Sequence, residues 1–290
     1  MKPSTWLELG RVSNLPTVWT NVLAAAALSG AMPTASWLGA ALVLFSCFYV
    51  GGMYLNDAFD REIDREERPT RPIPSGRASA GTVFAAGFGM LGAGIVGMSW
   101  LGRMARQGGG VDAGLSALGL ALAIVVYDAY HKHNPASPFL MGLCRVMVYV
   151  TTAVALTGGV PAAVGLGAVA LLAHLIGLTY AAKQENLKRL EGVWPLLLLL
   201  EPVFYGILLG VERPATLVFA LLLAAWLARS VRYLFSPSVR SIPAAVVRLI
   251  AGIALVDAML LASAGATHLA LLAVALCGLT RIFQRFVPGT

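Results

Sequence analysis

The chain carries little charge for its length. Only 12% of its 290 residues are Asp, Glu, Lys or Arg, which is about half the share found in an average soluble domain. Hydrophobic residues make up 58%, and the mean hydropathy is +0.77. Because this apolar character extends along the whole chain, it argues against a soluble domain with one hydrophobic tail. It indicates a polytopic membrane protein.

Cysteine and histidine are also scarce. The three cysteines, Cys47, Cys144 and Cys277, lie inside apolar runs, and their spacing fits neither a disulfide framework nor a zinc site. We therefore expect small buried side chains at these positions. His131 and His133 are two residues apart, which on a helix directs them to different faces, so a paired histidine metal site is not expected.

Two further features are missing. No apolar run precedes the first hydrophobic span, so we expect no separate signal peptide. The net charge is +7, but the basic residues lie between hydrophobic segments instead of on a soluble module. Nucleic acid is therefore not expected as a partner, and basic loops on the cytoplasmic side of a bilayer explain the charge.

Hydrophobic runs of the length needed to cross a bilayer, about twenty residues, recur along the chain. They cover residues 15–33, 35–56, 79–102, 112–130, 137–158, 160–182, 193–211, 214–235, 243–264 and 266–285. The break between the last two is weak, so we expect nine or ten spans in a single domain over 1–290. Lys and Arg concentrate in alternate loops, which places the N-terminus on the cytoplasmic side, and both termini there if there are ten spans.

The most informative stretch follows the second hydrophobic run, where residues 56–77 read NDAFDREIDREERPTRPIPSGR. Asn56, Asp60 and Asp64 are spaced four residues apart, so on a helix their side chains form one stripe at the cytoplasmic end of a span. Mg²⁺ is commonly held by one or two carboxylates together with phosphate oxygens and water. The following arginines suit phosphate. The stretch therefore predicts a site for a cation and a diphosphate, against the alternative of a solvated helix end with local ion pairs.

The two linked motifs in this stretch resemble those of the UbiA superfamily of intramembrane prenyltransferases. Asn-x-x-x-Asp-x-x-x-Asp closes the second span, and Arg-Pro-Ile-Pro-Ser-Gly-Arg follows at 71–77. The run LGRVSNLPTVWTNVLA at 9–24 is similar in particular to the UbiA-like EboC subfamily of bacterial ebo clusters. The resemblance implies an all-helical bundle of about nine spans around a central cavity that opens to the cytoplasmic side. It also implies the bacterial inner (cytoplasmic) membrane.

The resemblance further implies an activity. Family members transfer a prenyl group from an allylic prenyl diphosphate, with Mg²⁺ as cofactor, to an aromatic or other acceptor. Within the motif, the implied Mg²⁺ ligands are Asn56, Asp60 and Asp64, and the implied diphosphate-binding arginines are Arg68, Arg71 and Arg77. The acceptor and the length of the prenyl chain are left open.

The second acidic motif of the family is degenerate here. Its form is Asp-x-x-Tyr-Ala-x-x-Asp-x-x-x-Asp, and the matching run is GLTYAAKQENLKRL at 177–190. Tyr180 matches, but Gly177, Gln184 and Lys188 stand at the three aspartate positions. Two interpretations remain open. In the first, Lys188 and Gln184 bind the diphosphate in place of a second cation. In the second, the chain is a divergent, non-catalytic member that binds or carries a lipid-linked precursor.

Further candidates for substrate binding lie outside the two motifs. Tyr127 and Lys132, at the end of the fourth span, match a Tyr and a Lys of the family. Lys132 is expected to reach the diphosphate and to act in catalysis with Asp60 and Asp64. Arg145 lies inside an apolar span, where a guanidinium is costly unless it is paired or faces water.

Four more polar residues lie in or at the ends of apolar spans. Asn21 lies on a face of the first span that faces the cavity in the family. Asp128 has the spacing for an ion pair with Lys132 four residues later. Glu201 and Asp257 are functional candidates because carboxylates inside a membrane are rarely without a role.

Overall fold

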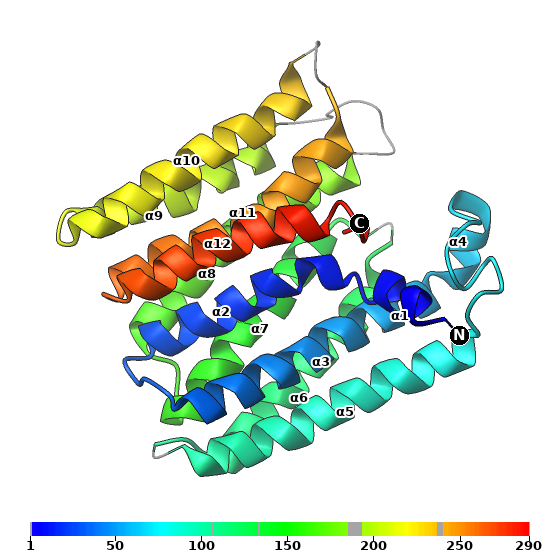
Figure 1. Ribbon diagram of the computed structural model, residues 1–290, viewed down its shortest axis with the longest axis horizontal. Coiled ribbons are helices and arrows are strands. Elements are labelled where there is room, and N and C mark those ends of the chain that lie inside the picture. Colours follow the sequence, from blue (N-terminus) through cyan, green and yellow to red (C-terminus); the bar gives the residue numbers. More distant parts are fainter. Residues whose placement is uncertain (1, 106, 133, 185–192, 237–239, 290) are drawn as a thin grey trace.

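The computed structural model describes residues 2–105, 107–132, 134–184, 193–236 and 240–289. Over these residues the regular structure is entirely helical. Figure 1 shows long helices that run nearly side by side, with the N- and C-termini at the same end of the bundle. The predicted all-helical, multi-pass membrane class is therefore confirmed.

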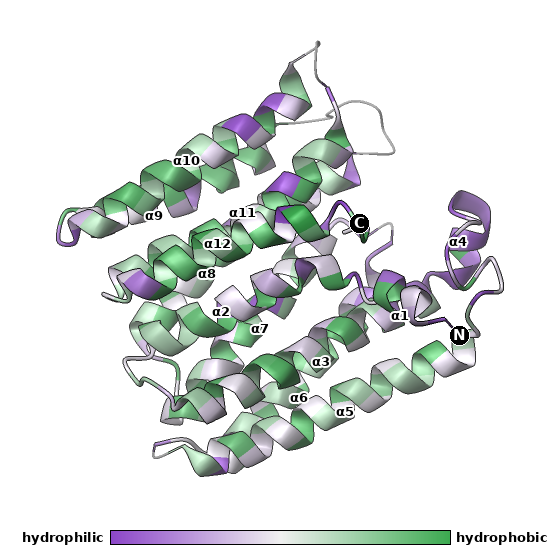
Figure 2. Ribbon diagram, viewed as in Figure 1, coloured by the Kyte–Doolittle hydropathy of each residue, from purple (hydrophilic) through white to green (hydrophobic). Residues whose placement is uncertain are grey.

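The helices follow the hydrophobic runs closely. In chain order the elements are α1 (Pro3–Leu9), η1 (Val12–Asn14), α2 (Leu15–Leu28), α3 (Ala35–Phe59), α4 (Arg61–Glu67), α5 (Ala80–Met104), α6 (Gly110–Tyr130), α7 (Ser137–Thr157), α8 (Ala162–Lys183), η2 (Trp194–Leu200), α9 (Glu201–Gly210), α10 (Pro214–Phe235), α11 (Ile242–Ser263) and α12 (Thr267–Phe283). Each predicted span contains a helix, and the run at 193–211 is divided into η2 and α9. Figure 2 shows the contrast between the largely hydrophobic long helices and the hydrophilic α4.

Seven of the described helices have the length and composition to cross a membrane: α3, α5, α6, α7, α8, α10 and α11. Two other apolar segments, Trp194–Gly210 and Thr267–Phe283, are shorter than that, and α2 has 14 residues. A full crossing takes about twenty. The count of nine or ten spans stays a prediction, as do the cytoplasmic orientation, the bacterial inner membrane and the single domain over 1–290.

Glycines allow α3 and α5 to approach closely, which positions the end of α3 that carries the acidic stripe. A Cβ atom added at Gly87 would lie 2.8 Å from the Leu55 side chain, and one added at Gly94 would lie 2.6 Å from the Phe48 ring. Both distances are shorter than a van der Waals contact. Since small residues are the usual means of close helix packing in lipid, these two glycines bring α3 against α5.

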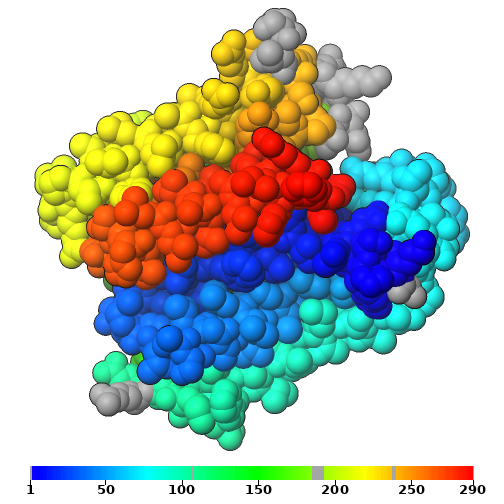
Figure 3. Space-filling view, in the orientation of Figure 1, coloured from blue at the N-terminus to red at the C-terminus, as the bar shows by residue number. Residues whose placement is uncertain are grey.

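The end of the chain packs against its beginning. Figure 3 shows α12 beside α2 on one face of the molecule. At the end that holds both termini, Gln284 donates a hydrogen bond of 2.9 Å from Nε2 to Oδ1 of Asn14, and Asn14 donates one of 2.9 Å from Nδ2 to the carbonyl of Gly289. These contacts fix the segment before α2, which contributes to the site described next.

Candidate metal and diphosphate site

The predicted stripe is continuous across the junction of α3 and α4. Asp60 lies between the two helices, its N–H bonds to the Asn56 carbonyl at 2.9 Å, and the Asp64 N–H bonds to the Asp60 carbonyl at 2.8 Å. The i to i+4 spacing is therefore kept over both helices. The three residues are only 5%, 5% and 1% exposed in chain order. The sequence predicted the stripe, and the packing of the bundle buries it.

Two arginines neutralise the buried acids. Arg71 places Nη1 2.8 Å from Oδ2 of Asp64 and 3.1 Å from Oδ1 of Asp57. Arg11 places Nη2 2.8 Å from the same oxygen of Asp57 and 3.3 Å from Oδ1 of Asn56. Buried carboxylates need such partners because an unpaired buried charge is costly. The predicted Arg71 is thus part of the cluster, and Arg11 is a member that the sequence motifs did not reveal.

Arg11 reaches the cluster through an uncommon backbone conformation. Its φ of 41° makes it the one non-glycine residue with positive φ in the described part of the chain, a conformation that costs energy for a side chain with a Cβ. Burial lowers the pKa of its guanidinium, but the charge of Asp57 and of other nearby groups outweighs burial, so the pKa lies above its ordinary value. The ion pair with Asp57 accounts for the retention of this conformation.

The end of α6 approaches Asp60. His131 Nε2 lies 3.4 Å from Oδ2 of Asp60, and Lys132 Nζ lies 3.8 Å from the same oxygen and 3.7 Å from Oε2 of Glu67. The ring of Tyr127 stacks on that of His131 with 5.0 Å between centroids. The predicted Tyr127 and Lys132 are therefore brought to the acidic stripe.

Asp128 contacts the stripe at its other end. Asn56 donates a hydrogen bond of 3.1 Å from Nδ2 to Oδ1 of Asp128, while Oδ2 of Asp128 has no hydrogen-bond partner among the described residues. The side chain is 3% exposed. The ion pair that the spacing suggested between Asp128 and Lys132 does not form, because Lys132 lies at Asp60 and Glu67 instead.

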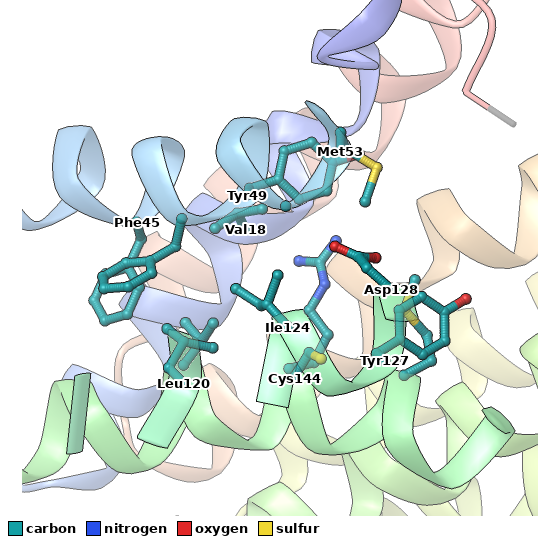
Figure 4. A pocket seen from close by; sticks show the side chains of 14 residues that line it. Val18, Phe45, Tyr49, Met53, Leu120, Ile124, Tyr127, Asp128 and Cys144 are labelled. Carbon is teal, nitrogen blue, oxygen red and sulfur yellow. The ribbon is translucent and has the colours of Figure 1, made fainter. Parts of the chain in front are cut away.

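A cavity adjoins this cluster between α2, α3, α6 and α7. The volume of this cavity is about 60 Å³. Figure 4 shows Phe45 and Leu120 at one end, Asp128 and Tyr127 at the other, and Ile124 between them. The lining is mainly apolar, which is the kind of surface that a hydrocarbon chain with its polar end near Asn56 would contact.

The predicted Arg145 and Asn21 meet in a separate buried network. Arg145 lines the cavity and donates from Nη1 to Oδ1 of Asn21 at 2.9 Å and from Nη2 to Oγ1 of Thr17 at 3.1 Å. Asn21 donates from Nδ2 to Oδ2 of Asp257 at 2.8 Å, and the Tyr149 hydroxyl donates to the other oxygen of Asp257. The network joins α2, α7 and α11. Asn21 is fully buried within it, and Asp257 accepts the hydrogen bonds of both Asn21 and Tyr149.

The two other predicted arginines lie apart from the cluster. Arg77 forms two hydrogen bonds with the Glu8 carboxylate, at 2.6 and 3.0 Å, and one of 2.7 Å to the Thr70 carbonyl. The hydrogen bond to Glu8 raises the pKa of this guanidinium. Arg68 ends α4 and is exposed. Their predicted roles in diphosphate binding stay predictions.

At Gly177, the first position of the degenerate second motif, a neighbouring side chain occupies the space. A Cβ atom added at Gly177 would lie 2.7 Å from Cγ of Leu199 in η2, so an aspartate side chain has no room there. Tyr180 is partly buried, and Gln184 is buried at the C-terminal end of α8. Lys188 lies outside the described residues. The space that an acid would need at Gly177 is thus taken by an apolar side chain.

Comparison with known proteins agrees with this architecture. The model of the UbiA prenyltransferase family matches residues 14–256. The digeranylgeranylglyceryl phosphate synthase of Methanopyrus kandleri is 31% identical over 229 residues, which is 76% of this chain and 75% of that protein. The synthase of Ignicoccus hospitalis is 42% identical over 79 residues, 27% of this chain. That second match spans only 25% of the length of the relative.

Solved structures show the same fold. A UbiA homologue from Archaeoglobus fulgidus, bound to GPP and Mg²⁺, has a TM-score of 0.59 at 15% identity and covers 91% of this chain and 99% of its own. A structure of digeranylgeranylglyceryl phosphate synthase has a TM-score of 0.56 at 20% identity and covers 98% and 95%. The predicted UbiA-like bundle is confirmed, while the closer likeness to the EboC subfamily stays a prediction. The chain belongs to the UbiA prenyltransferase family.

Proposed function

We propose that this chain is a Mg²⁺-dependent intramembrane prenyltransferase. It would transfer a prenyl group from an allylic prenyl diphosphate to a small acceptor that is not yet identified. The observation that carries the proposal is the buried stripe of Asn56, Asp60 and Asp64, with two arginines on it and an apolar cavity beside it. The names of the archaeal relatives and the GPP and Mg²⁺ in the A. fulgidus structure support it.

The oxygen atoms of Asn56, Asp60 and Asp64 are the donors proposed to hold Mg²⁺. They fit this ion because amide and carboxylate oxygens are hard ligands, and because Mg²⁺ takes few protein ligands and keeps phosphate oxygens and water. No three His, Cys, Asp or Glu side chains converge on one point within the described residues, which is compatible with such a sparse set. When bound, Mg²⁺ supplies positive charge that makes diphosphate a better leaving group.

The cations of the cluster would bind the diphosphate itself. Arg71 and Arg11 now pair with carboxylates through one guanidinium nitrogen each, and a guanidinium can bind phosphate oxygens through two of its N–H groups. Lys132 contributes a third positive charge next to Asp60. As the bond between C1 of the prenyl group and the diphosphate oxygen breaks, negative charge grows on that oxygen. Fixed positive groups stabilise this charge, which is the larger part of the expected catalysis.

The cavity would hold the prenyl chain and protect the cationic carbon. Phe45, Leu120 and Ile124 line it with apolar surface. Tyr127 presents a ring near the end where the allylic carbon would lie, and aromatic faces stabilise cations. The acceptor nucleophile then bonds to C1 and releases a proton, so the products are the prenylated acceptor, diphosphate and one proton.

The second candidate function is that of a divergent, non-catalytic family member that binds or carries a lipid-linked precursor. The observation that favours it is the replacement of the second acidic motif, where Leu199 fills the space at Gly177. The two functions differ in whether a carbon–oxygen bond is broken. An assay of product formation therefore separates them.

The test is an incubation of the purified protein in lipid with radiolabelled allylic diphosphates of several chain lengths, Mg²⁺ and a cell extract as the source of acceptor. We expect labelled product that depends on Mg²⁺ and is lost with Asp60→Asn. The matched control is Asp112→Asn, an exposed acid in the first turn of α6, which should keep activity. Binding of the diphosphate without product would support the carrier, and absence of both would refute the family-derived function altogether.

A further inference from the structure

The stripe of Asn56, Asp60 and Asp64 is too long for a single ion. On a continuous helix, Asn56 and Asp64 would lie about 12 Å apart along the axis, whereas Asn56 and Asp60, like Asp60 and Asp64, would lie about 6 Å apart. Two oxygen ligands of one Mg²⁺ lie at most about 4.2 Å apart, since each is about 2.1 Å from the ion. Side chains as short as Asn and Asp do not close a 12 Å gap. Asn56 and Asp64 are therefore not ligands of the same ion, and Asn56 shares its ion either with Asp60 or with a group on another helix.

The structure provides that partner on α6. Asp128 Oδ1 lies 3.1 Å from Nδ2 of Asn56, close to the roughly 3 Å that separates two neighbouring ligands of an octahedral Mg²⁺. The nitrogen and oxygen of an Asn amide exchange places by a half-turn of the group. That turn would cost Asn56 its 3.1 Å hydrogen bond to Asp128 and its 3.3 Å contact with Arg11, but Arg11 would keep its 2.8 Å contact with Asp57.

Within the part of the chain that the structure describes, Asp128 also has a carboxylate oxygen without a hydrogen-bond partner beside the cavity. Its Oδ2 has no hydrogen-bond partner in the described residues, and the side chain is 3% exposed. Among those residues no Lys, Arg or His forms an ion pair with it. Figure 4 shows its carboxylate directed from α6 into the cavity, towards α3. A bound cation would stabilise the ionised form of this buried carboxylate, since a buried charge is costly without a partner.

We propose that Asp128 and Asn56 form a second cation subsite, next to a first subsite made by Asp60 and Asp64. The inference rests on the proposed function, because both subsites would hold cations for the bound diphosphate. It changes the assignment of the stripe, since Asn56 then acts with Asp128 and does not share an ion with Asp64. It also places the second ion on α6, away from the closed position at Gly177.

The test counts bound cations and does not depend on turnover. Mn²⁺ replaces Mg²⁺ as the probe, and electron paramagnetic resonance measures free and bound Mn²⁺ in the presence of geranyl thiodiphosphate, an unreactive allylic diphosphate. We expect two bound Mn²⁺ per wild-type chain and one in each of the variants Asp128→Asn and Asp60→Asn. The double variant that carries both substitutions should bind none. The matched control is Glu201→Gln, because Glu201 also has a buried oxygen without a hydrogen-bond partner but lies on α9; it should keep two.

Each other outcome is decisive. Two Mn²⁺ in Asp128→Asn, or a single Mn²⁺ in the wild type, overturns the second subsite and leaves the proposed function standing. No Mn²⁺ in the wild type overturns the proposed function itself. Asp128→Ala is the second variant in case Asp128→Asn does not fold. Size-exclusion elution and circular dichroism identify which of the two is folded, and the folded variant is counted.

Discussion

Removal of Arg71 is the most direct test of the charge balance in the acidic cluster. In the wild type, Nη1 of Arg71 lies 2.8 Å from Asp64 and 3.1 Å from Asp57. Arg71→Ala leaves the side chain of Asp64, which is only 2% exposed, without any cationic partner in the described chain, whereas Asp57 keeps Arg11. Loss of one partner from a buried ion pair costs about 3–5 kcal/mol. We expect about 3 kcal/mol, since only Asp64 loses its sole partner.

The assay is thermal unfolding of the purified protein in detergent, followed by circular dichroism. For a large domain, 1 kcal/mol corresponds to roughly 2–4 °C, so Arg71→Ala should lower the midpoint by about 6–12 °C in metal-free buffer. Because a bound cation replaces the missing charge, Mg²⁺ should raise the midpoint of Arg71→Ala more than that of the wild type. Arg71→Lys should lie between the two, since lysine keeps the charge and loses the geometry.

The control is Arg65→Ala. Arg65 pairs with Glu62 at 2.7 Å, but both side chains are at least 60% exposed, and such pairs contribute about 0–1 kcal/mol. Its midpoint should change by at most about 4 °C. The reasoning fails if Arg71→Ala unfolds within 2 °C of the wild type, or if Mg²⁺ raises both midpoints equally. Either result would mean that the ion pair with Arg71 does not stabilise an ionised Asp64 in the folded protein.

Four further outcomes follow from the same structure. Asp60→Asn should reduce prenyl transfer by roughly a hundredfold, measured as labelled product, because fixed charge at the leaving group is the main catalytic contribution. Removal of divalent cations with EDTA should abolish transfer, and Mg²⁺ should restore it. Gly177→Ala should destabilise the fold by about 1–3 kcal/mol through overpacking against Leu199; Gly165→Ala on the same helix, where an added Cβ meets nothing within 4 Å, should not lower the thermal midpoint. Asp257→Ala should cost about 1–3 kcal/mol because it leaves the buried Asn21 amide without its acceptor; an unchanged midpoint would contradict that role.

The acidic stripe and the helices could be predicted because both depend on short spacings. A helix repeats every 3.6 residues, so Asn56, Asp60 and Asp64 share a face wherever that segment lies. The hydrophobic runs give the positions of the long helices because a bilayer crossing takes about twenty apolar residues. Tyr127 and Lys132 were found through the family resemblance, and the structure brings both to the stripe.

The partners of the stripe could not be predicted in this way. Arg11 meets Asp57, which is 46 positions later, and Asn56 meets Asp128, 72 positions later. Both contacts depend on how α3 packs against its neighbours. The spacing favoured an ion pair between Asp128 and Lys132, yet the packing of α6 directs Lys132 to Asp60 and leaves one oxygen of Asp128 unused.

By itself, then, the sequence determined the helical class, the membrane setting and one row of candidate ligands, since each follows from local spacing and from the cost of burying charge. Only the tertiary structure decided which charges balance that row and which positions of the second motif are closed. Asn21 and Asp257 are 236 positions apart and 2.8 Å from each other, and Leu199 fills the space at Gly177. Contacts of this kind depend on where whole helices come to rest, because each helix carries its side chains as a rigid row.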